Sequence, residues 1–590
     1  MYRSIQTKSI SRRTQAPLAF ALAFALGQSA APARAGVLMD HADPIGPIAA
    51  SRFNTGLKMG EQKAVLARQF ARRNPPLPPT AHRPAGTVVV ANCDDSGAGS
   101  LREALATAAS GDVINLTALT CSTISLSSGQ LTVAVDDLAV RGPGTEQLVI
   151  DGNSDSRILA HTGYGLLDID GVSLRNGNYA YTGPVLYSGL AAGGCLLSTG
   201  NVTLTNSKIE NCSAAGTSVS GAAIDAHGRL IMTDSTVSGV SATATSNEIS
   251  ATIYGGAVYA AASYLTHATI SNATVSASAT TAFGGAFGGG IFSLYGIVLT
   301  DSRISGVSVD VSAAKIAYAK GGGIGTPRTV VMSGSTVADN SVRGTPGVGA
   351  SGAYTYISAI GGGGVYIASI PRGVPPASSI TGSTISGNSA TCSADIGQYT
   401  VGGGGGIATW SPARLTIVNS TISGNSAATM GGGLYSRHFG AFGLSNSTVT
   451  DNTAPDGSGV ADQGEEWPYD FSTLSSLVAG NHATGAQAFE ITTLHTIGGA
   501  NNLIASANVA LPPGTLSGDP MLAPLADNGG PTRTHALLPG SPAIDQGSNP
   551  DNLASDQRGA TFLRVFGNST DIGSYELQPL PERIFANGFD

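Results

Sequence analysis

A repeated unit runs through the middle of this 590-residue chain and restricts its fold more than any other feature. Each copy has a cluster of Gly or Gly and Ala, one aliphatic residue, a short apolar stretch, and a Ser/Thr-rich strand centred on Ile or Val. A unit of this size cannot bury its apolar face alone, so the repetition is typical of a solenoid whose coils stack on one another. The aliphatic positions, spaced by 27 to 42 residues, are Leu196, Ile224, Val258, Ile291, Ile324, Val365, Ile407 and Leu434.

Composition indicates that the coils are built from strands. The chain has 80 Gly and only 12% charged residues, whereas helical repeats need Ala, Leu, Glu and Lys. Each coil should hold three strands, one after the glycines and two at sequences such as 415–418 and 421–423. Strands stacked coil on coil form parallel sheets, and their crossovers are right-handed. We predict an all-β, right-handed parallel β-helix of the pectin-lyase-like kind, with Ile422 pointing inward and Ser423 outward.

The segment before the repeats predicts a helix that covers the start of the solenoid. Ser100 precedes Leu101-Arg102-Glu103-Ala104-Leu105, and a Glu three residues after a Ser forms a capping box. We expect this helix to close near Gly111 and to shield an open strand edge that would otherwise invite aggregation. Short strands bounded by Gly, Asp or Asn should follow around residues 113–116, 124–126, 131–135, 138–140, 148–150 and 166–169.

The N-terminus predicts export. Basic residues, an apolar run over 18–26 and Ala33-Arg34-Ala35 form a signal peptide, and ordinary export is favoured over the twin-arginine route that Arg12-Arg13 suggests. That run is too short to span a bilayer, so we expect no transmembrane segment in the mature chain. We divide the chain into a signal peptide (1–35), a disordered or Pro-rich linker (36–86), an N-terminal cap with the first coils (87–192), the repeat β-helix (193–497), a small C-terminal end-cap segment (498–578) and a tail (579–590).

Charge and cysteine content fit an exported protein. The first 35 residues hold five of the 30 basic residues and no acidic one, so their removal leaves 25 basic against 38 acidic residues and a net charge of −13. We therefore expect no nucleic-acid partner, because phosphate binding needs a basic face. Five cysteines suit an oxidising compartment. We predict the disulfides Cys93–Cys121 and Cys195–Cys212, leave Cys392 unpaired, and expect no metal and no cofactor.

One polar position recurs in consecutive coils. Three residues after the third-strand aliphatic, five repeats place an Asn, and stacked Asn side chains can bond to one another. Earlier repeats place Cys212, Val240, Ser278 and Val307 at this position, so the ladder should run only through the C-terminal half. The predicted ladder is Asn340, Asn388, Asn425, Asn452 and Asn481.

Carboxylates give weak candidates for chemistry. Asp168 and Asp170 lie on one strand face, where an exposed pair could hold Ca²⁺ or act on a sugar. No cation is paired with them locally, so we favour a solvated outer face. Asp225 and His227 also share a face, and we expect a solvent-facing pair. In the C-terminal segment, salt bridges and turns are expected at Asp545, Asp556, Arg558, Asp571 and Glu576.

Aromatic residues offer a better lead. One residue after the inward aliphatic, several coils carry a ring that should point outward, and a row of exposed rings can bind sugar faces. Gly325 and Ala408 interrupt this row, which weakens the case. The possible glycan contacts are Tyr259, Phe292, Tyr366 and Tyr435, with the long loops at 341–360 and 389–401 as further contact regions.

Two sequence segments give a family resemblance. SLREAL from Ser100 and RGPGTEQLVIDGNSDSRIL from Arg141 resemble the N-terminal segment of bacterial secreted right-handed parallel β-helix proteins with a CSLREA-type domain, although Gly99 stands at the family's Cys. ADNGGPTRTHALLPGSPAIDQGSN from Ala526, DQRG and DIGSYEL resemble the choice-of-anchor Q domain of the same group. The resemblance implies secretion or surface display and no established chemistry. The tail PLPERIFANGFD is similar to tails of some Gram-negative secreted proteins, which implies an extracellular or outer-membrane-attached location.

Two functions compete. The first is a structural or adhesive interaction protein with glycans or surface proteins as partners. The second is a carbohydrate-active enzyme, a polysaccharide lyase or glycoside hydrolase. An exterior groove that gathers three or more carboxylates with Arg or Lys would favour the enzyme.

Overall fold

A computed structural model of the chain describes residues 86–578, except 182–189, 249, 282, 348–357, 369–376, 393–399, 402, 411–413, 438–441, 465–470 and 486–488. The expected signal peptide, most of the linker and the tail lie outside the described residues, as does most of the two long loops. No helix in the described part of the chain is both long and apolar enough to cross a membrane.

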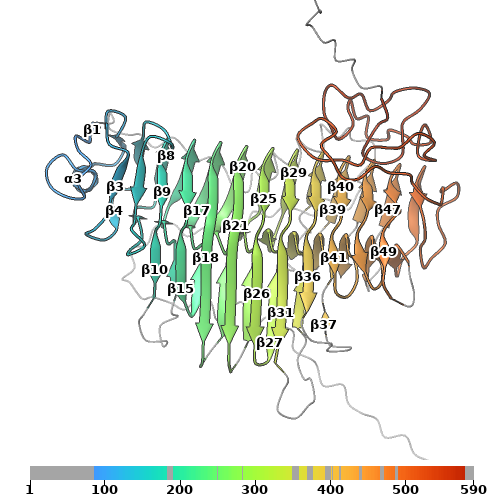
Figure 1. The fold of residues 1–590 in the computed structure, drawn as a ribbon, viewed down its shortest axis with the longest axis horizontal. Helices are drawn as coiled ribbons and strands as arrows, with labels where there is room; N and C mark the ends of the chain where they lie inside the picture. The colour runs from blue at the N-terminus through green and yellow to red at the C-terminus, as the bar shows by residue number, and fades with distance from the viewer. Residues whose placement is uncertain are drawn as a thin grey trace, which may run out of the picture. The chain divides into compact units, whose positions relative to one another are not determined.

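Stacked strands form a right-handed parallel β-helix (Figure 1). The strands belong to three sheets of 24, 21 and seven strands, called the first, second and third sheet, and the pairings between them are parallel. Ile324 lies opposite Val365, which lies opposite Ile407 in the next coil. The eight repeat aliphatics are all fully buried. The repeat pattern therefore sets the register of the first sheet.

A complete coil has five strands rather than the three expected. In one coil these are β27 (Ile316–Lys320) in the third sheet, β28 (Ile324–Thr326) and β29 (Val330–Ser333) in the first, and β30 (Thr336–Ala338) and β31 (Ser341–Pro346) in the second. The two missed strands, β27 and β31, come from the stretch of variable length before the glycines. Ala, Gly and Ser are frequent there and have weak strand propensity, so the prediction assigned this stretch to loops.

The N-terminal segment begins with the expected helix. Helix α3 (Leu101–Thr107) lies between β1 (Thr87–Val89) and β2 (Asp112–Asn115), which pair with each other. Ser100 Oγ accepts from the Glu103 N–H (3.3 Å), and Glu103 Oε2 accepts from the Gly99 N–H (2.6 Å). Together these bonds satisfy free N–H groups at the start of the helix. The helix ends at Thr107, earlier than expected.

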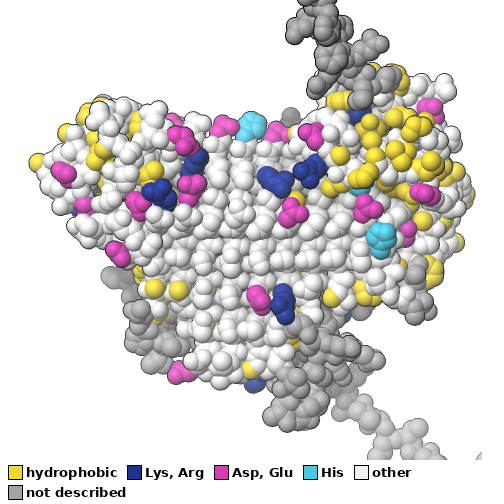
Figure 2. Space-filling model, in the orientation of Figure 1, with side chains coloured by type: hydrophobic (Ala, Val, Ile, Leu, Met, Phe, Trp, Pro, Cys, Tyr) yellow, Lys and Arg dark blue, Asp and Glu magenta, His cyan; other side chains and the backbone are white. Residues whose placement is uncertain are grey.

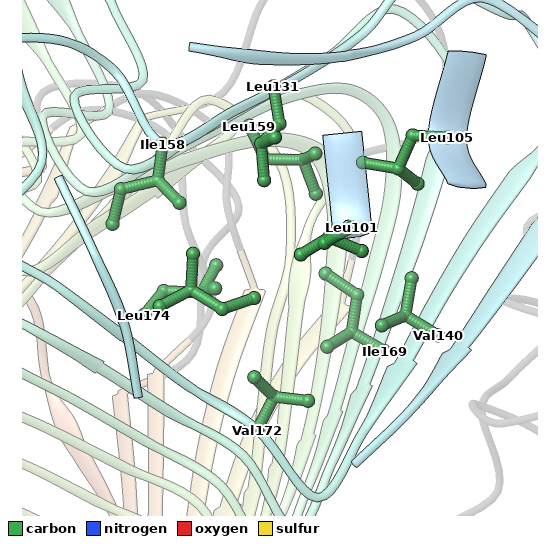
Figure 3. Close-up of a pocket in the computed structure, with 10 residues that line it drawn as sticks. Leu101, Leu105, Leu131, Val140, Ile158, Leu159, Ile169, Val172 and Leu174 are labelled. Atoms are coloured by element: carbon green, nitrogen blue, oxygen red, sulfur yellow. The ribbon is translucent and has the colours of Figure 1, made fainter. Parts of the chain in front are cut away.

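Helix α3 covers the apolar interior of the first coils. Leu101 and Leu105 point toward Leu131, Leu159 and other core side chains around a cavity of about 10 Å³ (Figure 3). The lining is wholly aliphatic, and empty cavities in proteins are apolar. This hollow is a packing void beneath the cap and not a ligand site.

Both predicted cysteine pairs are disulfides in the structure. Cys93 is joined to Cys121, with their Cα atoms 6.5 Å apart, and Cys195 to Cys212, at 5.6 Å. Cys392 is free and half-buried.

The predicted asparagines form a buried, hydrogen-bonded ladder. Each side-chain amide donates to the Oδ1 of the Asn in the next coil, from Asn340 to Asn388 (2.9 Å) and onward to Asn481 (2.8 Å). Asn481 then donates to Glu490 Oε2 (2.9 Å). The earlier coils place Ala273, not Ser278, at this position, because Val240 lies opposite Ala273.

A second buried ladder, of serines, was missed from the sequence. It lies at the turn from the first to the second sheet. Ser335 Oγ donates to Ser333 O (2.9 Å) and accepts from the Ser302 N–H (3.1 Å), and the same pattern recurs in neighbouring coils. These serines satisfy turn N–H groups that strand pairing leaves open. The signal was the Ser that follows Asn, Asp or Gly in most repeats.

The residue before each of these turn serines has a left-handed backbone. We call this row the left-handed column. Asn and Asp tolerate this conformation, and Gly adopts it without strain. From one coil to the next, its members are Asn206, Asp234, His267, Asp301, Gly334, Gly382, Asn419, Asn446, Ser475 and Asn501, with φ between 43° and 57°.

The β-helix continues past the expected boundary at residue 497, through β51 (Ile497–Ala500) and β52 (Leu503–Ile504). Leu516 bridges to Leu503 and closes the end. The chain then folds back over the outer face of the second sheet near β40 (Thr421–Ser423) and β47 (Phe471–Leu474) (Figure 1). We call residues 505–578 the C-terminal segment. It covers a flank of several coils, in addition to the end that was predicted.

Candidate functional site

The four aromatic residues expected to form an exposed row point out of the core, but most of their surface is covered. Phe292, Tyr366 and Tyr435 are 8%, 7% and 5% exposed, and Tyr259 is partly buried. They lie where the third and first sheets meet, so outward side chains of the two sheets contact each other. Tyr254 of the third sheet packs edge-on against Phe292 at 5.3 Å between ring centroids. The expected exposed platform is therefore wrong.

A lysine completes this aromatic corner. Lys320 Nζ donates to the Tyr366 hydroxyl (3.0 Å) and lies 4.9 Å from the centre of that ring. The rings of Tyr318 and Trp410 are 5.4 and 5.3 Å from the same nitrogen. Such cation–π contacts stabilise packing. The sequence did not reveal this cluster because its residues come from coils up to 92 positions apart.

The structure separates Asp168 and Asp170 as chemical groups. Asp168 forms an ion pair with Arg141, which lies one coil earlier, so the expectation that no cation is paired with it was wrong. Asp170 Oδ1 accepts from Asn206 Nδ2 (3.4 Å). Each carboxylate thus binds a neighbouring coil, and the two do not act as a free pair.

Asp225 is buried, contrary to the expected solvent-facing pair. It lies on β17 (Ile224–Thr233), is 1% exposed, and its Oδ1 is 3.4 Å from His227 Nε2. The Ser220 hydroxyl lowers its pKa slightly, but no hydrogen bond of normal geometry among the described residues reaches either carboxylate oxygen. Burial raises the pKa of Asp225 to about 6, and the charges of His227 and Arg157 oppose this rise. A buried carboxyl of this kind is costly at neutral pH.

Arg157 lies beside this carboxyl and has a structural role. Its Nε donates to Gly193 O and its Nη2 to Ala192 O, both at 2.7 Å. Ala192 ends β11 (Leu190–Ala192), the first strand of the third sheet. The guanidinium therefore caps carbonyls at the edge of that sheet, and it stacks on the Tyr179 ring at 4.1 Å.

The charged residues of the C-terminal segment form a buried network, as expected from their Gly- and Pro-rich surroundings. Arg558 lies between the rings of Phe562 and Tyr575, 3.8 Å from each centre, and donates to Asp556 Oδ2 (2.6 Å). Glu576 accepts from two backbone N–H groups, and burial raises its pKa to about 7. Asp571 and Asp545 also accept backbone N–H groups. These residues hold the segment together.

An open cleft of about 330 Å³ lies between the left-handed column and the C-terminal segment. The column contributes Gly334, Gly382 and Asn419, and the facing wall contains Pro531 and residues 551–557. This volume is at the lower end of the range for small-molecule sites. The two walls are more than 100 residues apart in sequence, so no local motif pointed to the cleft.

Asn419 connects the two walls. Its Nδ2 donates to Ser555 O (3.2 Å), which fixes the orientation of the amide. Its Oδ1 is buried and has no hydrogen-bond partner in the described part of the chain. On the same side, Asp551 Oδ2 accepts from Ser445 Oγ (2.5 Å). The cleft thus presents hydrogen-bond acceptors to whatever enters it.

No group of three or more His, Cys, Asp or Glu side chains within the described ranges is arranged to hold a metal ion.

Comparison with known proteins adds little beyond the fold. No protein-family model matches the chain, and no curated protein matches it. The crystal structure of pectate lyase Pel9A is 9% identical, with a TM-score of 0.28, over 84% of this chain and 97% of that chain. A TM-score this low carries no argument about function. The assignment of a parallel β-helix rests on the strand pairings described above.

Proposed function

We propose that this chain is a secreted or cell-surface β-helix protein with a structural or adhesive role, and that it binds glycans or surface proteins without cleaving them. The observation that carries this proposal is the open, acceptor-rich cleft held between a rigid solenoid and the segment docked on it. Binding sites are commonly built on loops that a rigid scaffold positions.

The surface chemistry supports a binding role. Figure 2 shows that the coils carry few charged side chains on this face, while hydrophobic side chains gather on the C-terminal segment. Leu563, Val565 and Phe566 of that segment are exposed. Exposed apolar residues of this kind occur at interaction sites. A partner surface and a ligand cleft would then lie on the same segment.

The family resemblance stays part of the proposal. We propose that residues 87–160 form a CSLREA-type N-terminal segment and that residues 526–577 form a choice-of-anchor Q domain. The signal peptide and tail would place the protein outside the cell or on the outer membrane of a Gram-negative bacterium, with the two disulfides suited to that compartment.

The test is a paired binding and cleavage experiment on the mature chain. A glycan array should give specific binding, while pectin and polygalacturonate, with or without Ca²⁺, should yield no reducing or unsaturated ends above a heat-treated sample. Product formation that Asp168→Asn or Asp225→Asn abolishes would instead establish the carbohydrate-active enzyme.

A further inference from the structure

The cleft exists because two glycines interrupt the left-handed column. The coils on either side carry Asp301 and Asn419 in this column, whereas Gly334 and Gly382 lack side chains. A Cβ added at Gly382 would meet only Gly334 N, at 3.9 Å, so the space beside it is open. A Cβ added at Gly334 would instead overlap the Asp301 carboxylate. The hollow is therefore centred on Gly382.

The lining favours a ligand that donates hydrogen bonds. A buried oxygen without a partner, such as Asn419 Oδ1, costs about 1–3 kcal/mol. A water or a ligand hydroxyl would remove that cost, and the Asp551 carboxylate is a second acceptor on the lining. Hydroxyl groups are donors that can reach both acceptors.

The charge of the lining disfavours anionic ligands. No Lys or Arg is among the residues that line the cleft. Asp556, the other acid there, is occupied by Arg558 and by the Glu576 N–H (2.9 Å). Asp551 remains as a negative charge at the cleft and would repel a carboxylate or phosphate. Pro531 and Leu553 add apolar surface that suits the C–H face of a sugar ring.

We infer that this cleft binds a neutral saccharide unit, with ligand hydroxyls donating to Asn419 Oδ1 and to Asp551. The inference rests on the proposed binding function and adds the site and the ligand class.

The test uses the full mature chain in native gels that contain dextran, mixed-linkage β-glucan, galactomannan or polygalacturonate. Gly382→Asn fills the hollow with a residue that this column already carries at four positions, so the backbone is retained. We expect retardation by at least one neutral polymer and none by polygalacturonate. Gly382→Asn should weaken the apparent affinity at least tenfold, and Asp551→Asn should weaken it severalfold.

Gly424→Asn is the matched control. Gly424 also has a left-handed backbone (φ 66°), and its added Cβ would meet only Gly387 N, at 3.8 Å. It does not line the cleft, so this variant should bind like the wild type. Equal binding by Gly382→Asn and wild type would overturn the site while leaving the binding function intact. Polygalacturonate binding at the cleft would overturn the ligand class, and a wild type that binds no glycan would overturn the site and its ligand class together.

Discussion

The coils before and after Gly321 fill the same inner position in two different ways. In the earlier coils it holds a disulfide-bonded Cys212 and the apolar Val240, Ala273 and Val307, all buried. From Asn340 onward the same position holds amides bonded coil to coil. One backbone template therefore accepts either apolar stacking or a fully satisfied polar chain. Buried polar groups persist here because each one has its partners.

The outer faces of the two regions also differ. Ser238 and Ser423 occupy equivalent positions in the second sheet, which the register links through Ser271, Ser305, Ala338 and Ser386. Ser238 is half-buried, whereas Ser423 is 2% exposed because the C-terminal segment covers it. The expectation that Ser423 faces solvent was therefore wrong. Burial at one strand position depends on what docks from elsewhere in the chain.

The largest effect should come from breaking the amide ladder. Asn425 Oδ1 accepts from the Asn388 N–H and amide, and its own amide donates to Ile385 O and Asn452 Oδ1. Asn425→Ala strands several buried groups, so we expect about 3–5 kcal/mol of lost stability. Val240→Ala in the apolar region should lose about 2 kcal/mol. Urea denaturation measures both, and an equal loss would show that the ladder bonds contribute little.

A smaller, pH-dependent effect is expected at Asp225, in the earlier coils. Its pKa is raised to about 6 in the folded state, so the folded state holds the proton more tightly than the unfolded state. Stability is therefore greatest at low pH and falls as pH rises from about 4 through 6, by about 1–3 kcal/mol. Asp225→Asn should match wild type at pH 4 and melt higher at pH 7.5. Parallel melting curves across this range would contradict a buried, raised carboxyl.

The smallest effect concerns the docked flank. Ser423 Oγ bonds His535 Nε2 (2.7 Å), and burial lowers the pKa of His535, so at pH 7.5 the ring is neutral. Ser423→Asp then places a carboxylate under the C-terminal segment without a counter-charge and should cost about 1–2 kcal/mol. Ser238→Asp should change stability by less than about 0.5 kcal/mol. Limited proteolysis of residues 505–578 provides a second readout, and equal behaviour of the two variants would mean that the segment does not cover Ser423.

The sequence was sufficient for features that repeat locally and insufficient for those that depend on docking. The spacing of Ile324, Val365 and Ile407 predicted both the solenoid and the inward face, and the recurring Asn predicted the ladder. Ser423 and the cleft at Gly382 could not be predicted, because their surroundings come from residues more than 100 positions away. The aromatic row failed for a related reason. Strand alternation places Tyr366 outside the core, but it does not say that Lys320 and Trp410 cover it.

The asparagine ladder has an electrical polarity. Every side-chain amide donates toward the C-terminal end, so the amide dipoles from Asn340 to Asn481 point the same way along the axis. Their positive ends accumulate at the last coil, much as backbone dipoles do at the start of a helix. Glu490 receives the final amide and the Gly480 N–H (3.1 Å) there. An acid ends the row because an anion there compensates the combined field of the amides.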